Sequence, residues 1–389
     1  MSTTPSAFVI ELPEGSLAIH DLSLGTPAPD APVVLAVHGI TANGLSWRRV
    51  ADEVGRRHGP GGVRFLAPDL RGRGDSRSAP GPYGLGAHVD DLTSIATVFG
   101  SAPVLVGHSM GAFIAALAAA RHPERFPAAV LVDGGMAFPV PDDLDIDAAL
   151  QSVIGPAMDR LSMRFAGPAA YLGFWSGHPA LGPVLNGPGG DAARAYIEHD
   201  ILQDPSDGQW RSTCVLEAVR ADGADVMADR ETHAGLATAV GEGVRAELVW
   251  AERGLLDEPQ GLYDESRLAA LHLPEGVRTT RVDANHYDVI LGTRASHQSS
   301  TPSTASSSRA DDDRDGVHRL WVMPAWRTSA DPAVMTGIHV NADTFARAET
   351  DRMFTAIARD AGGVNQLNHS RVPTPLDHQP VIRMNRDTL

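Results

Sequence analysis

The chain of 389 residues contains one cysteine, Cys214, and no lysine, so all 32 of its basic side chains are arginine. A single cysteine forms neither an internal disulfide nor a cysteine-based zinc or iron–sulfur site. Aromatic residues are scarce at 5% of the chain, although 43% of all residues are hydrophobic. The core must therefore consist mainly of alanine, valine and leucine.

Positive charge is also scarce, because the 32 arginines face 48 aspartate and glutamate residues and leave a formal net charge of −16. Nucleic acids and anionic membranes bind positively charged surfaces, so this balance argues against both as partners. The first 21 residues lack the basic and apolar stretches of a signal peptide, and the apolar run at 112–120 is too short to cross a bilayer. We expect a cytoplasmic protein without membrane insertion that acts on a small molecule.

Short apolar runs that end in glycine or aspartate turns recur along the chain. They lie at 33–37, 64–68, 104–106, 129–132, 246–250 and 279–282. Continuous apolar strands that alternate with helical patterns predict a mostly parallel, doubly wound sheet covered on both faces, and hence an α/β fold. Two earlier runs, at 9–10 and 17–19, flank a Pro-Glu-Gly turn and predict an antiparallel hairpin.

Helical spacing replaces the strand rhythm between about 135 and 245, which predicts a helical cap inserted over the strand ends. Residues 293–333 begin with a Ser/Thr-rich and then acidic stretch that predicts a disordered linker. Within the remaining tail, 334–389, the apolar spacing predicts one amphipathic helix over 343–361. One helix makes a poor independent core, so we place the functional domain in residues 1–292.

The strongest chemical signal is the segment 107–111 (GHSMG), which follows one apolar strand and precedes a helix of small residues. Such a strand–turn–helix lifts a serine hydroxyl above the edge of the sheet, which predicts Ser109 as a nucleophile. The alternative is a serine that only caps a helix in a Gly-rich turn. Acyl transfer also needs two backbone N–H groups to bind an oxyanion, and we expect them from Met110 and Ile40.

A general base is expected after the last strand, where the segment 283–287 (DANHY) offers His286. The acid that orients this base has two main candidates. Asp257, in the loop after the next-to-last strand, is preferred, and Asp133, directly at the end of the preceding strand, is the alternative. Glu252 is a third choice.

Two further residues are candidates for substrate contacts. His38 ends the first parallel strand, where a role in bracing the following loop is favoured over proton transfer. Trp175 lies in the predicted cap, where aromatic side chains form either a substrate pocket or the core of the cap.

Together these features resemble the α/β-hydrolase family over about residues 5–292. The resemblance is carried by His38-Gly39 with Trp47, the segment 69–76 (DLRGRGDS), the segment 107–111 and Asn285-His286-Tyr287. It implies an α/β-hydrolase fold with a helical cap, in which 69–76 is structural. The chain departs from the family where many relatives have Trp-Gly followed by the acid, because Ala251 follows Trp250 here.

The same resemblance narrows the reaction. A serine at this position implies hydrolysis of a carboxylic ester, thioester or lactone through an acyl-enzyme, with no metal and no organic cofactor. Carbon–carbon bond hydrolases and cofactor-free peroxidases of the same fold use a similar triad, and some members bind ligands without turnover, so these remain alternatives. The segments 345–351 and 381–389 resemble the opening of a domain family of unknown function. We interpret 334–389 as a truncated fragment of such a domain and assign it no activity.

Overall fold

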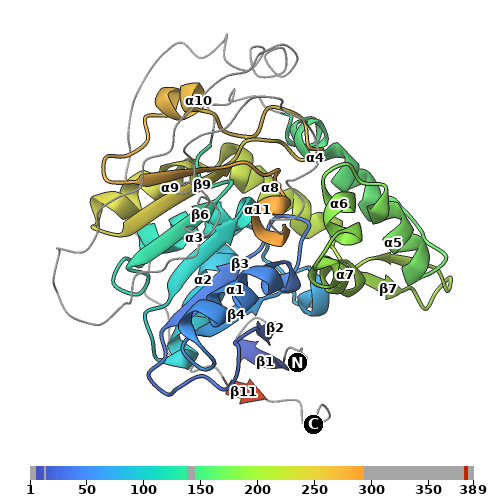
Figure 1. Cartoon of the computed structure of the whole chain (residues 1–389), viewed down its shortest axis with the longest axis horizontal. Helices are drawn as coiled ribbons and strands as arrows, with labels where there is room; N and C mark the ends of the chain where they lie inside the picture. Colours follow the sequence, from blue (N-terminus) through green and yellow to red (C-terminus); the bar gives the residue numbers. More distant parts are fainter. Residues whose placement is uncertain (1–5, 13–14, 138–144, 293–380, 384–389) are drawn as a thin grey trace, which may run out of the picture.

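The computed structural model describes residues 6–12, 15–137, 145–292 and 381–383, and a central sheet dominates this part of the chain (Figure 1). Its nine strands follow the order β10-β9-β6-β5-β3-β4-β2-β1-β11. Their bounds are β1 Ser6–Leu12, β2 Gly15–Asp21, β3 Val33–Val37, β4 Arg64–Pro68, β5 Val104–His108, β6 Ala128–Val132, β9 Arg245–Ala251, β10 Arg278–Val282 and β11 Val381–Arg383.

The six strands from β10 to β4 in this order are parallel, as the apolar runs predict. The register pairs Leu35 with Leu105 and Leu105 with Ala129, which aligns the carboxyl ends of neighbouring strands. The predicted hairpin is formed by β1 and β2, and β2 joins β4 in antiparallel orientation. The chain therefore has the expected α/β-hydrolase fold, with its loops gathered at one edge of the sheet.

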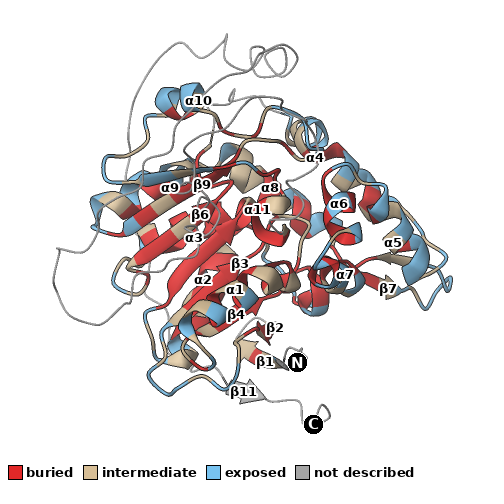
Figure 2. Cartoon of the chain, viewed as in Figure 1, coloured by how far each residue is buried: buried red, intermediate tan, exposed pale blue. Residues whose placement is uncertain are grey.

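Helices cover both faces of the sheet. One face carries α2 (Leu85–Phe99), α3 (Met110–Arg121), α9 (Arg230–Gly241) and α10 (Glu265–Ala270), and the other carries η1 (Gly44–Trp47), α1 (Arg48–His58) and α11 (Asp288–Leu291). Side chains alternate along β5, so that Leu105 packs in the first layer, while Val104 and Val106 pack in the second. Figure 2 shows the strands and α3 as the buried centre of the molecule.

The predicted cap at 135–245 divides into two parts. The cap itself contains α4 (Ile146–Ser162), α5 (Pro168–Ser176), α6 (Leu181–Asn186), α7 (Gly190–His199) and the antiparallel pair β7 (Ile201–Gln203) and β8 (Trp210–Ser212). In contrast, α8 (Leu216–Ala228) and α9 belong to the core. Gly235 of α9 approaches the backbone of α3 closely, and Asp222 of α8 bonds to His88 of α2. Sequence spacing identifies helices here but not which layer each one joins.

A buried ionic cluster holds the cap together. Arg160 of α4 pairs with Asp200 at the end of α7 and donates to the hydroxyl of Tyr171 on α5 at 2.6 Å. All three side chains are buried. The same guanidinium donates to the carbonyl oxygen of Thr41 at 3.2 Å, which connects the cap to the loop after β3.

The tail enters the described structure only at β11, which pairs with β1 in antiparallel orientation through Val9↔Arg383 and its neighbours. The predicted linker at 293–333 and the predicted helix at 343–361 lie outside the described residues and stay predictions. Among the helices that the structure describes, none combines the length and the apolar character needed to cross a membrane.

The start of α3 lies directly against the end of β3. A Cβ atom at Gly111 would overlap the carbonyl oxygen of Val37 and lie 2.7 Å from that of His38. Because backbone atoms cannot move aside as a flexible side chain does, only glycine allows this helix to approach the sheet so closely.

We therefore expect Gly111→Ala to lower the free energy of unfolding by about 1–3 kcal/mol through overpacking. Gly173→Ala is the matched control, because Gly173 lies in α5 with no atom within 4 Å of the added methyl group. It should be neutral or stabilise the protein by up to about 1 kcal/mol, since alanine favours helix. Urea unfolding of both variants measures the difference, and equal effects would contradict the close-approach argument.

Candidate active site

Ser109 occupies the turn between β5 and α3, at the edge where the parallel strands end. Its backbone has φ 55° and ψ −122°, a conformation with positive φ that residues other than glycine rarely adopt. The turn is held by a hydrogen bond from Ser109 N to Val132 O, 2.9 Å long, at the end of the neighbouring strand β6. The half-buried serine is thus held in the strained turn that the segment 107–111 predicts.

A carboxylate and an imidazole meet beside this turn. Asp133 follows β6 directly, and its Oδ2 accepts a 2.6 Å hydrogen bond from Nδ1 of His286. Its Oδ1 accepts a hydrogen bond of 3.1 Å from the backbone N–H of Ala251, at the end of β9. Both side chains are buried. The structure therefore places Asp133, the alternative candidate, against the predicted base.

Asp257, the preferred candidate from the sequence, is not the carboxylate beside His286. It lies in an exposed turn after β9, where its Oδ1 accepts hydrogen bonds from Arg253 Nε at 2.8 Å and Asn285 Nδ2 at 3.1 Å. Glu252 bonds instead to Arg281 on β10. The turn carries Asp257 away from the imidazole, while Asp133 emerges from a strand end that is already at the site.

The loop after β3 carries Ile40, one predicted oxyanion donor. Nδ1 of His38 donates to Gly39 O at 2.8 Å, and its Nε2 accepts from Leu70 N at 3.0 Å. In a trans peptide the N–H points opposite to the C=O, so this contact also fixes the direction of the Ile40 N–H. The other predicted donor, Met110, is the first residue of α3, where backbone N–H groups have no partner within the helix.

The position of His38 favours the bracing role over a contact with substrate, which stays a prediction. The side chain is fully buried, and both ring nitrogens are engaged with the backbone. Burial lowers the pKa of His38 to about 3, so the ring stays neutral and keeps the proton on Nδ1 that its contact with Gly39 requires.

Arg73 holds the carbonyl side of the same loop, a contact that the sequence did not predict. Its Nε and Nη2 donate to Ile40 O at 3.0 and 2.9 Å, and its Nη1 pairs with Asp222 at 2.5 Å. Asp222 also accepts hydrogen bonds from Gly84 N and His88 Nε2. Burial opposes ionisation of Asp222, but the Arg73 charge together with the contacts to His88 and Gly84 outweighs it and lowers the pKa of Asp222 below the usual range. The segment 69–76 thus acts as a brace for the loop of Ile40.

The imidazole of His286 lies beside the turn between β5 and α3, because it contacts His108, the residue before Ser109. The ring centroids of His108 and His286 are 4.5 Å apart, and His108 Nε2 lies 2.8 Å from the carbonyl oxygen of His286. The nucleophile candidate and the base candidate are therefore both attached to the end of β5 by direct contacts.

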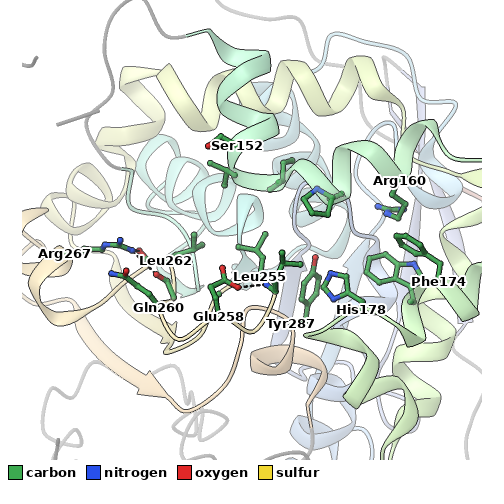
Figure 3. Close-up of a pocket in the computed structure, with 18 residues that line it drawn as sticks. Ser152, Arg160, Phe174, His178, Leu255, Glu258, Gln260, Leu262, Arg267 and Tyr287 are labelled. Carbon is green, nitrogen blue, oxygen red and sulfur yellow. Dashed lines mark hydrogen bonds between the residues drawn. The ribbon is translucent and has the colours of Figure 1, made fainter. Parts of the chain in front are cut away.

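A cavity of about 190 Å³ lies between the cap and the loop after β9 (Figure 3). Its walls include Trp175 and Phe174 of α5, Leu255 of the loop and Tyr287, the residue after His286. Ser109 and His286 are not among these walls, but the ring of Tyr287 lies beside that of His286, with a centroid distance of 5.6 Å. Trp175 lies where a substrate contact was predicted, and this role stays a prediction.

One group of described residues has the spacing of metal ligands: His20 of β2, Asp69 after β4 and His199 of α7. Of the two imidazoles, only that of His199 is hydrogen-bonded to Asp69, while His20 lies close to the same carboxylate oxygen. Asp69 Oδ2 lies 2.7 Å from His199 Nε2 and 3.2 Å from His20 Nε2. The carboxylate also accepts hydrogen bonds from the backbone N–H groups of Gly44 and Asp75. These contacts satisfy the carboxylate without an ion and connect the cap to the core.

Comparison with known proteins agrees with this architecture. Residues 32–153 match the family model described as alpha/beta hydrolase fold. Lipase LipV of Mycobacterium tuberculosis is 36% identical over 121 residues, which cover 31% of this chain and 44% of that protein. The magnesium-chelatase 30 kDa subunit of Rhodobacter capsulatus is 29% identical over 194 residues, 47% of this chain and 61% of that protein. The matches thus span less than two thirds of either curated relative.

Solved structures extend the likeness over most of the described chain. The crystal structure of E-2-(acetamidomethylene)succinate hydrolase superimposes with a TM-score of 0.55 and 22% identity, covering 74% of this chain and 94% of that one. The family match and the shared topology together show that this chain is an alpha/beta hydrolase fold protein.

The contact between His199 and Asp69 predicts a pH-dependent stability. Burial opposes protonation of His199, but the Asp69 carboxylate outweighs it and raises the pKa above 6.5. The contribution of the pair is therefore complete below about pH 6.5 and is lost as the pH rises through the raised pKa. We expect His199→Gln to cost about 1–2 kcal/mol at pH 6 and less at pH 9, measured by urea unfolding. The exposed His58→Gln serves as control, and a constant difference for His199→Gln across this range would contradict the ion pair.

Proposed function

We propose that this protein is a serine hydrolase that cleaves a small or medium carboxylic ester, thioester or lactone through an acyl-enzyme. In this mechanism Ser109 attacks the carbonyl carbon, His286 accepts the serine proton and returns it to the leaving group, and Asp133 orients the imidazole. The observation that carries the proposal is the 2.6 Å hydrogen bond between His286 Nδ1 and Asp133 Oδ2 beside the strained turn of Ser109.

The hydrogen bond determines which ring nitrogen does the chemistry. Because the Asp133 carboxylate accepts, Nδ1 of His286 carries a proton, and the lone pair of neutral imidazole is on Nε2. That atom takes the proton of Ser109. The buried negative charge of Asp133 then stabilises the imidazolium that forms, without itself becoming protonated.

We infer that the N–H groups of Ile40 and Met110 bind the oxyanion of the tetrahedral intermediate. His38 and Arg73 support this role, because they hold the two carbonyl groups that flank Ile40 in the loop. Donors that are fixed before the reaction need no reorganisation when negative charge develops, which is where this type of catalysis gains its rate.

The cavity beside Tyr287 supports an apolar group on the substrate. Its walls come from α4, α5 and the loop after β9, and they are mostly leucine, other aliphatic and aromatic side chains. We propose that Trp175 contacts the substrate there. A serine rather than an aspartate at position 109 supports an ester over an epoxide or a halide as the substrate.

A fluorophosphonate probe tests the proposed nucleophile. We expect the wild-type protein to be labelled stoichiometrically, and Ser109→Ala to remain unlabelled, as read by intact-protein mass spectrometry. Absence of labelling in folded wild-type protein would favour a ligand-binding role without turnover.

Turnover of p-nitrophenyl esters of graded chain length should exceed that of a vinylogous diketone, which reports carbon–carbon bond hydrolysis.

The two aspartates give a matched pair of variants. We expect Asp133→Asn to lower kcat for ester hydrolysis about 10³–10⁴-fold, because an amide at this position favours the wrong tautomer of His286. Asp257→Asn should change kcat less than about threefold, since the exposed Asp257 contacts Arg253 and Asn285 and not the imidazole of His286. Equal losses in the two variants would show that neither residue has the role assigned to it.

A further inference from the structure

His108 is a buried, titratable residue that the proposed mechanism does not use. It is the last residue of β5 and directly precedes Ser109. Because side chains alternate along a strand, its ring lies on the same face as Val104 and Val106. That layer also contains Trp47, whose ring meets His108 edge to face at a centroid distance of 6.4 Å.

Among the described residues, the hydrogen bond that the His108 side chain makes is directed at the proposed base. Nε2 of His108 lies 2.8 Å from the backbone carbonyl oxygen of His286, and the two rings are tilted by 40°. A carbonyl oxygen only accepts, so Nε2 carries the proton and donates. Burial, followed by the neighbouring His286, lowers the pKa of His108 well below its ordinary value. The ring is thus neutral, with its proton on a defined nitrogen.

The loop that carries His286 is held by several hydrogen bonds. Asp133 binds the imidazole at Nδ1, and Asn285 Oδ1 accepts from the N–H groups of Tyr287 and Asp288. The backbone of His286 is held on both sides, because its N–H lies 3.4 Å from Gly254 O and its carbonyl oxygen accepts from His108 at 2.8 Å. Of these bonds, the shorter one from His108 ties the backbone of His286 to the residue next to Ser109.

We propose that His108 is a positioning residue, whose Nε2–H holds the backbone of His286 and so sets the distance between the base and Ser109. This inference rests on the proposed function. The end of β5 then positions both Ser109 and His286, the two partners of the proposed proton transfer. The other titratable groups near His108 are His38, which is neutral, and His286 itself, so a neutral His108 does not compete for the proton that leaves Ser109.

Three variants separate positioning from packing. His108→Leu removes the donor, and we expect kcat to fall about 10–100-fold with KM within about twofold, because small displacements of a base are costly. His108→Gln supplies a new N–H group and should recover kcat to within about fivefold of wild type. Val106→Ala, on the same face of β5, should lower the melting temperature while kcat stays within about twofold.

Nitrogen-15 NMR of the wild-type imidazoles tests the contact without any substitution. His108 should remain the neutral Nε2–H tautomer from pH 5 to pH 9. A turnover of His108→Leu within twofold of wild type, or titration of His108 in this range, would overturn the proposal. Fluorophosphonate labelling of wild-type Ser109 distinguishes failure of the proposed function from failure of this proposal. Absence of labelling rejects the hydrolase. Labelling of the wild type, combined with an unchanged kcat of His108→Leu, rejects only the role of His108. If His108→Leu does not fold, the kcat of His108→Gln and the NMR tautomer of wild-type His108 test the proposal instead.

Discussion

The hydrogen bond between His286 and Asp133 joins residues 153 positions apart, and the arrangement of the site depends on it. It forms because β5, β6, β9 and β10 are adjacent and parallel, so that the loops at their carboxyl ends meet at one edge. Ser109 leaves β5 and Asp133 leaves β6, and Ser109 N bonds directly to the last residue of β6. A change in the strand order would separate the three side chains, whatever their local sequences.

Two buried ion pairs, one in the core and one in the cap, stabilise the loops at this edge of the sheet. Arg73 with Asp222, and Arg160 with Asp200, are buried pairs. Both arginines also donate to backbone carbonyl groups, although Nε of Arg160 is without a hydrogen-bond partner among the described residues. Such pairs contribute little net stability over an apolar core, but loss of one partner leaves a buried charge and is strongly destabilising. Both arginines donate to carbonyl groups of the loop after β3, at Ile40 and Thr41. We interpret these pairs as devices that hold that loop in one conformation.

Much of this arrangement was predictable from local sequence. The parallel strands, the hairpin and the turn of Ser109 follow from apolar runs and from glycine spacing, which are properties of short segments. His286 was identified by its position after the last strand. The sequence preferred Asp257 as the acid, whereas the structure brings Asp133 against His286; both aspartates have the same order relative to Ser109 and His286, so sequence order alone does not separate them. What separates them is their place in the fold, because Asp257 lies in an exposed turn after β9, whereas Asp133 directly follows the last residue of β6. Contacts such as Arg73 to Ile40, or His108 to His286, depend on long-range packing and have no local signal.

The central claim is that one strained serine, one imidazole and two backbone N–H groups surround the same reacting carbon. A crystal structure of the protein inactivated by a phosphonate ester tests it most directly, because the adduct mimics the tetrahedral intermediate. The account predicts phosphorus bonded to Ser109 Oγ, the phosphoryl oxygen within hydrogen-bonding distance of the N–H groups of Ile40 and Met110, and His286 Nε2 facing the position of the leaving group. An adduct on another residue, or a phosphoryl oxygen that contacts neither N–H group, would contradict it.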